Sequence, residues 1–204
     1  TLPSSVKPLN YRITIEPNFG NFTFAGHEAI ELDVHKPIEA ITLNAVELSI
    51  QNCYLVTDTG SKIRVDQTVF DNENETVTLE FSKNIPAGKV SLHLEFNGEI
   101  NDKLRGFYRS RYTDLEGEER FLATTQFEST DARRAFPCWD EPSTKATFDV
   151  TLVIPNDLVA VSNMPISREQ EARTGTKAVQ FQQTPVMSTY LVAFIIGDLT
   201  CITR

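Results

Sequence analysis

The chain has 204 residues, of which 40% are hydrophobic and 23% are charged, and its net charge is −9. These proportions are typical of a globular protein with a sizeable core, so disorder is not expected. The acidic balance argues against nucleic acid or an anionic membrane as the main partner. No apolar run reaches the roughly 18 residues that a membrane span needs. The three cysteines form no CxxC pair and their number is odd, which favours a reducing compartment.

Apolar and polar residues alternate at every second position through most of the chain. The alternation predicts strands at residues 11–17, 28–35, 76–82, 89–96 and 148–155. One wet face and one apolar face per strand is typical of antiparallel sheets. Turn-forming residues separate these runs at 16–21, 58–61, 71–74 and 115–119, and loops are predicted at 84–89 and 168–177. With no sustained helical period, we predict an all-β sandwich or large curved sheet of about a dozen strands and little helix.

The last apolar run, YLVAFIIG at 190–197, predicts a strand that is buried on both faces. The chain stops seven residues after Gly197, so we expect that more chain once followed it.

Few residues offer chemistry of their own. His27, His35 and His93 each fall in an alternating strand, without an HExxH motif, so no metal site is expected in this chain. Cys138 has no implied base to activate it, which favours a buried structural role. The basic run RGFYRSRY at 105–112 fits an anion site or, as we prefer, an edge or interface strand.

The segment TTQFESTDARRAFPCWDEP, residues 124–142, interrupts the strand pattern with a dense set of charges. If its strand continues through Glu128, then Gln126 and Glu128 point to the same face. An amide and a carboxylate side by side can bind an ammonium group. Alternatively, Glu128 pairs with Arg133 or Arg134. A third possibility is an acid and base pair of a metal-independent enzyme, drawn from Glu128, Asp131, Asp140 and Glu141, but no nucleophile accompanies them.

Four stretches carry a resemblance to a known family: GEINDKLRGFYRSRY, TTQFESTDARRAFPCWDEPSTKATFDV, VSNMP and TPVMSTYLVAFIIGD. In order and spacing they resemble the N-terminal domain of the zinc (gluzincin) aminopeptidases, particularly the puromycin-sensitive, cytosolic branch. The resemblance covers nearly the whole chain. It implies that residues 1–204 form a single saddle-shaped, mostly antiparallel β domain in the cytoplasm, which packs on a catalytic zinc domain beyond residue 204.

The family's catalytic motifs, GAMEN and HExxH, are absent from these 204 residues. The resemblance therefore implies that zinc is bound outside this chain and that the fragment alone is inactive. The parent enzyme would remove single N-terminal amino acids from peptides. The rival hypothesis is a non-catalytic β-sandwich module that serves in binding or as a scaffold.

The resemblance also gives roles to residues of the charged segment. It implies that Glu128 binds the α-ammonium group of the peptide and that Gln126 lines the pocket for the first side chain. Around them we expect structural support. Arg133 and Arg134 would pair with nearby carboxylates such as Asp131, Asp140 or Glu141, while Phe136 and Trp139 would anchor the loop in the core or against the next domain.

Overall fold

The computed structural model describes residues 1–200, and strands account for most of this part of the chain. Two single-turn 3-10 helices, η1 (Ala132–Arg134) and η2 (Thr189–Leu191), interrupt the strands. The strands are β1 (Val6–Asn18), β2 (Thr23–Val34), β3 (Ile38–Asn44), β4 (Leu48–Thr57), β5 (Lys62–Arg64), β6 (Gln67–Asp71), β7 (Thr76–Ile85), β8 (Gly88–Glu99), β9 (Gly106–Thr113), β10 (Glu119–Gln126), β11 (Lys145–Pro155), β12 (Val159–Ser162), β13 (Ile166–Arg173), β14 (Thr176–Phe181), β15 (Met187–Ser188) and β16 (Phe194–Gly197).

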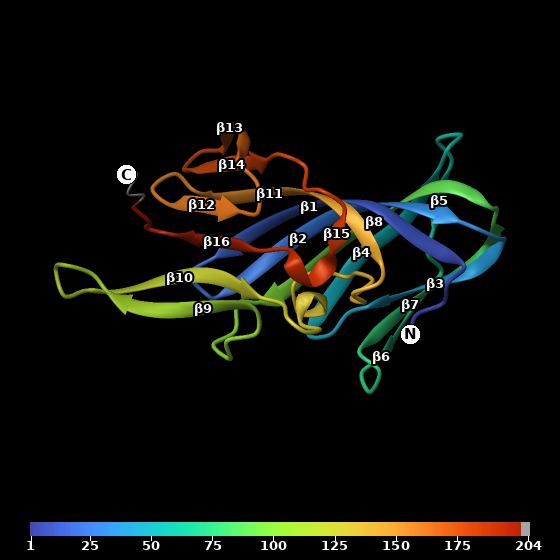
Figure 1. The fold of residues 1–204 in the computed structure, drawn as a ribbon, viewed down its shortest axis with the longest axis horizontal. Coiled ribbons are helices and arrows are strands. Elements are labelled where there is room, and N and C mark those ends of the chain that lie inside the picture. The colour runs from blue at the N-terminus through green and yellow to red at the C-terminus, as the bar shows by residue number, and fades with distance from the viewer. Residues whose placement is uncertain (201–204) are drawn as a thin grey trace.

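The strands form three sheets (Figure 1). The largest has nine strands in the order β13-β14-β11-β1-β2-β8-β4-β5, with β15 paired to β11. A four-stranded sheet has the order β12-β16-β10-β9, and a three-stranded sheet has the order β3-β7-β6. All these strand pairs are antiparallel except β1 with β11, which run parallel from Asn10 opposite Thr147 to Ile15 opposite Leu152. The predicted all-β, mostly antiparallel class is confirmed.

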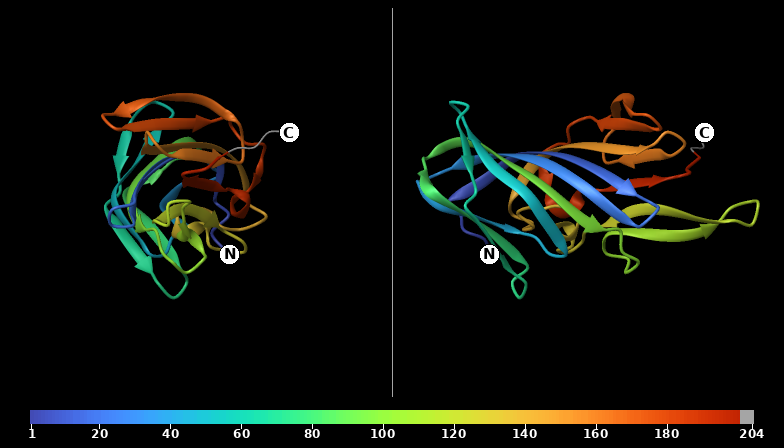
Figure 2. Two further views of the ribbon diagram at one scale, coloured as in Figure 1. Left: turned by 90° about the vertical axis from the view of Figure 1, so that its left-hand side faces the viewer. Right: turned by 180° about the vertical axis from the view of Figure 1, so that it is seen from behind.

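The core lies on the inner face of the large sheet, which curls around it when viewed along the long axis (Figure 2, left). The period-two pattern explains this directly, because alternate residues of each long strand are buried. On β1, for example, Tyr11, Ile13 and Ile15 have at most 1% of their surface exposed. The predicted sharing of one face by Ile30 and Leu32 on β2 is also confirmed, since both are fully buried.

Several local predictions are wrong. Residues 168–177 were expected to form a loop, but most of them belong to the β13–β14 hairpin. All eight residues of β13 are exposed at the sheet edge, so no apolar pattern marks the strand. The loop predicted at 84–89 shrinks to a tight turn between β7 and β8. Alternation needs several residues to be visible, so it does not reveal short strands such as β5 and β15. The described residues therefore contain sixteen strands, more than the dozen or so that were predicted.

The run YLVAFIIG is not one strand buried on both faces. It divides into η2 and the four-residue strand β16, and Leu191 is 47% exposed. Residues 201–204, with Cys201, lie outside the described part of the chain. The preferred interpretation of residues 105–112 is confirmed, because β9 is an edge strand of the four-stranded sheet. Its Arg111 pairs with Glu119 across the projecting β9–β10 hairpin.

His27 of β2 and His93 of β8 lie on the solvent side of the large sheet, whereas the exposed His35 follows the end of β2. The ring centroids of His27 and His93 are 6.3 Å apart, and Tyr54 stacks on His93 at 4.8 Å. Within residues 1–200 no group of three or more His, Cys, Asp or Glu side chains is arranged to hold a metal ion. None of the helices in this range is long and apolar enough to cross a bilayer.

Candidate functional site

The charged segment begins where β10 ends. The strand stops at Gln126 and not after Glu128, so the prediction of one strand through both residues is wrong. Glu128 lies in the following turn, in which the Asp131 amide donates to the Phe127 carbonyl at 2.9 Å. Phe127 is buried between Phe136 and Phe194, with ring centroids 5.9 and 6.2 Å away. The residues on either side of this anchor, Gln126 and Glu128, are both exposed.

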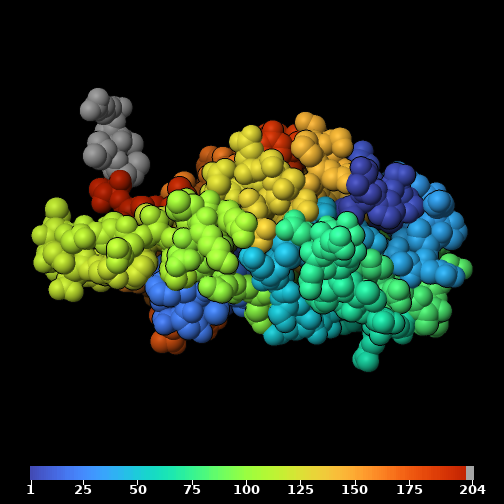
Figure 3. Space-filling view, turned by 90° about the horizontal axis from the view of Figure 1, so that it is seen from below, coloured from blue at the N-terminus to red at the C-terminus, as the bar shows by residue number. Residues whose placement is uncertain are grey.

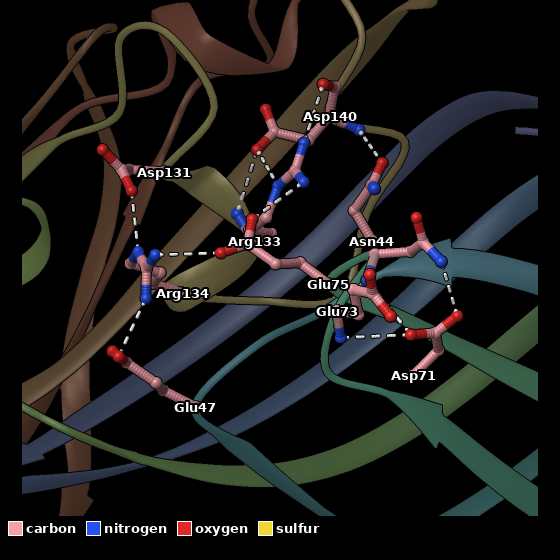
Figure 4. Close-up of polar contacts among 10 residues, drawn as sticks. Asn44, Glu47, Asp71, Glu73, Glu75, Asp131, Arg133, Arg134 and Asp140 are labelled. Carbon is pink, nitrogen blue, oxygen red and sulfur yellow. Dashed lines mark hydrogen bonds and ion pairs between the residues drawn. The ribbon is translucent and has the colours of Figure 1, made fainter. Parts of the chain in front are cut away.

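Arg133 joins the segment to a buried acid (Figure 4). Its Nε donates to Asp140 Oδ2 at 3.0 Å and its Nη1 donates to Glu75 Oε2 at 3.1 Å. The Asp140 side chain is only 1% exposed, and burial raises the pKa of this carboxyl although Arg133 pulls it down. The Asp140 amide also donates to Asn44 Oδ1 at 3.1 Å. This arrangement ties the segment to the end of β3.

Arg134 uses all three of its guanidinium nitrogens (Figure 4). Nε contacts Asp131 at 2.7 Å, Nη1 contacts Glu47 at 2.9 Å and Nη2 contacts Glu75 at 3.1 Å. The side chain is 9% exposed. Glu75 therefore bridges both arginines, one with each carboxylate oxygen. We call Arg133, Arg134 and their partners Asp131, Asp140, Glu47 and Glu75 the arginine cluster.

Two of the three acids expected to pair with the arginines do so, namely Asp131 and Asp140. Glu141 does not, because it accepts a hydrogen bond from the Leu2 amide at 2.6 Å. Sequence reasoning missed Glu47 and Glu75, which lie more than 55 residues upstream, in the β3–β4 and β6–β7 turns. No local pattern marks them. In the space-filling view of Figure 3 the yellow segment around residue 130 lies beside these blue-green turns.

The rest of the segment is fixed in the core. Phe136 and Trp139 are 0% and 2% exposed, respectively. Cys138 pairs with Asn44 as an isolated β-bridge, through N···O distances of 2.8 and 3.0 Å. The Trp139 amide donates to the Tyr11 hydroxyl at 3.1 Å. Burial raises the pKa of the Cys138 thiol well above its usual value, so this thiol is not a ready nucleophile.

A further acid, Glu28 of β2, lies near this part of the core. It is fully buried, and neither carboxylate oxygen has a hydrogen-bond partner among the described residues. Burial alone raises the pKa of Glu28 well above its usual value, which favours the neutral acid. Its charge would in turn raise the pKa values of Tyr11 and Cys138, after the larger effect of their own burial. The sequence held a signal for this burial, because Glu28 has the same strand parity as Ile30.

Glu128 differs from every acid of the arginine cluster. Within the described part of the chain it forms no ion pair. The alternative in which Glu128 pairs with Arg133 or Arg134 is therefore wrong for this structure. Gln126 and Glu128 remain as two exposed hydrogen-bond acceptors on either side of the buried Phe127. Such a pair of acceptors suits a cation with several N–H donors. The acid and base pair of a metal-independent enzyme finds no support, since Asp131 and Asp140 are bound to arginines.

Comparison with known proteins gives consistent matches. The model of the peptidase M1 N-terminal domain matches residues 7–191. The chain is 44% identical over 199 residues to puromycin-sensitive aminopeptidase of Caenorhabditis elegans, covering 97% of this chain and 21% of that protein. It is 43% identical over 204 residues to aminopeptidase 2 of Candida albicans, covering 100% and 21%. It is 44% identical over 199 residues to aminopeptidase M1 of Arabidopsis thaliana, covering 96% and 22%.

The chain thus spans about a fifth of the length of the curated relatives it matches. The family model covers most of the chain, and the fold is the all-β domain that the resemblance implied. The chain therefore belongs to the family of peptidase M1 N-terminal domains.

Proposed function

We propose that this chain is the N-terminal domain of a zinc aminopeptidase that removes single amino acids from the N-terminus of peptides. In this proposal Glu128 binds the α-ammonium group of the substrate, together with carboxylates of the catalytic domain, and Gln126 lines the pocket for the first side chain. The observation that carries it is the state of Glu128, which is exposed and has no ion pair within residues 1–200 although two arginines follow it closely in the chain.

The proposed site accounts for exopeptidase specificity by charge. A carboxylate at the closed end of a cleft is satisfied by a free amino terminus and is left unpaired by an internal peptide. The ammonium group offers three N–H donors, which the carboxylate of Glu128 and the amide oxygen of Gln126 can accept. Substrates with a blocked amino terminus would lose this interaction.

Zinc belongs to another part of the parent enzyme in this proposal. The described residues of this chain offer no set of donor side chains that fits the ion. The three or four convergent ligands of a zinc site would have to come from a catalytic domain of the same polypeptide. That domain is also the proposed partner of this one. We propose a cytosolic location because Cys53 and Cys138 are free thiols, as a reducing compartment would keep them.

The test is Glu128→Gln in the longer natural enzyme. Loss of a charge-assisted hydrogen bond should raise KM for free peptides roughly 10- to 100-fold. Glu116→Gln, at the exposed tip of the β9–β10 hairpin, is the charge-matched control and should leave KM unchanged. Gln126→Ala should alter the preference among first residues. An unchanged KM in Glu128→Gln would contradict the proposal and favour a non-catalytic binding or scaffold module.

A further inference from the structure

We propose that Glu47 and Glu75 are positioning residues for the recognition of the substrate amino group. They occupy guanidinium nitrogens that would otherwise compete for Glu128, and so they leave its carboxylate free. This inference rests on the role proposed above for Glu128, and it explains why that carboxylate is available to bind the substrate amino group.

Arginine is the obvious competitor for Glu128. Arg133 and Arg134 are the nearest basic residues along the chain, five and six positions after it. A guanidinium group presents five N–H donors in a fork that matches a carboxylate. An exposed carboxylate on a neighbouring turn would therefore be drawn to any such fork with free donors. Among the described residues Glu128 forms no ion pair, and both arginine forks are engaged by other carboxylates.

The two glutamates engage both terminal nitrogens of Arg134. Its terminal nitrogens Nη1 and Nη2 contact Glu47 at 2.9 Å and Glu75 at 3.1 Å. Asp131 takes only Nε, the nitrogen closest to the backbone. Without the two glutamates, both terminal nitrogens of Arg134 would be unpaired. Arg133 would keep Asp140 through its Nε but would lose Glu75 from Nη1.

The backbone at both glutamates points to a requirement for their carboxylates. Glu47 and Glu75 have φ values of 59° and 53°, in the left-handed region that glycine and asparagine occupy more readily. Two separate turns thus hold a glutamate where its conformation is unfavourable. Both side chains end on the same guanidinium group. Backbone strain that converges on one group is an observation from which a functional role can be inferred.

The experiment uses the longer natural enzyme with the double variant Glu47→Gln and Glu75→Gln. Glutamine keeps the size of each side chain and removes its charge. The terminal nitrogens of Arg134 would then face only neutral amide acceptors, so Arg134 should capture the charged Glu128, and KM for free peptides should rise roughly 10-fold while kcat stays the same. The charge-matched control is Glu116→Gln with Glu118→Gln in the exposed hairpin turn, which should change neither value.

Rescue separates this role from a structural one. Adding Arg134→Gln to the double variant removes the competitor, so KM should return toward the original value. A purely structural defect would be made worse by the loss of a third member of the arginine cluster. If the double variant leaves KM unchanged, or if the triple variant does not restore it, the inference is overturned.

Two comparisons keep the result interpretable. If Glu128→Gln itself leaves KM unchanged, the proposed function fails, and this inference fails with it. If Glu128→Gln raises KM but the double variant does not, only the inference fails. Should the double variant not fold, Glu75→Asn is the substitute, because asparagine suits the left-handed backbone and is too short to reach Arg134. KM must still rise in Glu75→Asn, and an unchanged value there overturns the inference.

Discussion

Asp140 and Glu28 are two buried acids that the fold accommodates in opposite ways. Asp140 as a whole residue is 3% exposed, and its carboxylate accepts hydrogen bonds from the side chain and the backbone amide of Arg133. Glu28 is fully buried and receives no hydrogen bond from any described residue. Burial raises the pKa of both carboxyls, but only at Asp140 does an arginine oppose the rise. Burial of Asp140 therefore requires the positive charge of Arg133, whereas burial of Glu28 requires that its carboxyl keep its proton.

Removing the partner of Asp140 should give the largest effect. Arg133→Ala leaves a buried carboxylate without its counter-charge, which should lower the free energy of unfolding by about 3 kcal/mol or more. Urea unfolding of this chain measures the loss. Arg12→Ala, which breaks the exposed pair with Glu31, is the control and should have a far smaller effect. Equal losses in the two variants would show that the buried pair of Arg133 and Asp140 is no more important for stability than an exposed pair.

Changing pH should separate Glu28 from Asp140. Above pH 4.5, the ordinary pKa of glutamate, the unfolded chain has lost the proton that folded Glu28 retains. The free energy of unfolding should therefore fall as pH rises, by about 1.4 kcal/mol per pH unit, until the raised pKa of the folded state is passed. The contribution is fully present below pH 4.5. Tyr11 and Cys138 stay neutral over this range, because burial raises their pKa values too.

Glu28→Gln should lose this slope, because glutamine does not titrate. Urea unfolding at a series of pH values, for the original chain and the variant, gives the difference directly. Glu95→Gln is the control, because Glu95 is exposed on the adjacent strand β8 and should leave the slope intact. Parallel pH curves for the original chain and Glu28→Gln would show that Glu28 is not neutral when folded.

A smaller effect should come from the glycine beneath the arginine cluster. Gly106 has a φ of +65°, and an added Cβ would lie 2.8 Å from the Cβ of Arg134. Gly106→Ala should therefore cost more than the roughly 1 kcal/mol of left-handed strain alone. Gly117→Ala in the hairpin turn is the matched control, with a φ of +88° and no atom within 4 Å of the added Cβ. If urea unfolding gives the same loss for both, the close approach of Arg134 does not matter.

The smallest effect on stability is expected at Glu128. Because it is exposed and forms no ion pair within residues 1–200, Glu128→Gln should change the free energy of unfolding by less than about 0.5 kcal/mol. Thermal unfolding of this chain checks the value. A larger loss would place Glu128 among the structural acids with Asp140, and it would weaken the case for a free ligand-binding carboxylate.

The sequence predicted what repeats locally. Alternation located the long strands, because each buries one face. The shared parity of Ile30 and Leu32 correctly placed both residues on the buried face of their strand. It failed where burial does not alternate. β13 is wholly exposed, and the run 190–197 is divided by η2, so neither shows the pattern of its structure.

For the candidate site, the sequence predicted the partners Asp131 and Asp140 because they lie within seven residues of the arginines. It could not predict Glu47 and Glu75, since their approach depends on how the three sheets meet. The end of β10 at Gln126 was also missed. Buried Phe127 and the turn to Asp131 determine that boundary, and both depend on the packing of Phe136 and Phe194.

The parallel pairing of β1 with β11 has a consequence for synthesis on the ribosome. Asn10 of β1 is synthesised long before its pairing partner Thr147, which is 137 residues later in the chain. At typical translation rates this delay is on the order of ten seconds. During that time β1 can pair with β2, but its other edge has no partner, and unpaired edges invite association between chains. A nascent chain of this protein therefore passes through a long interval in which shielding of its first strand decides between folding and aggregation.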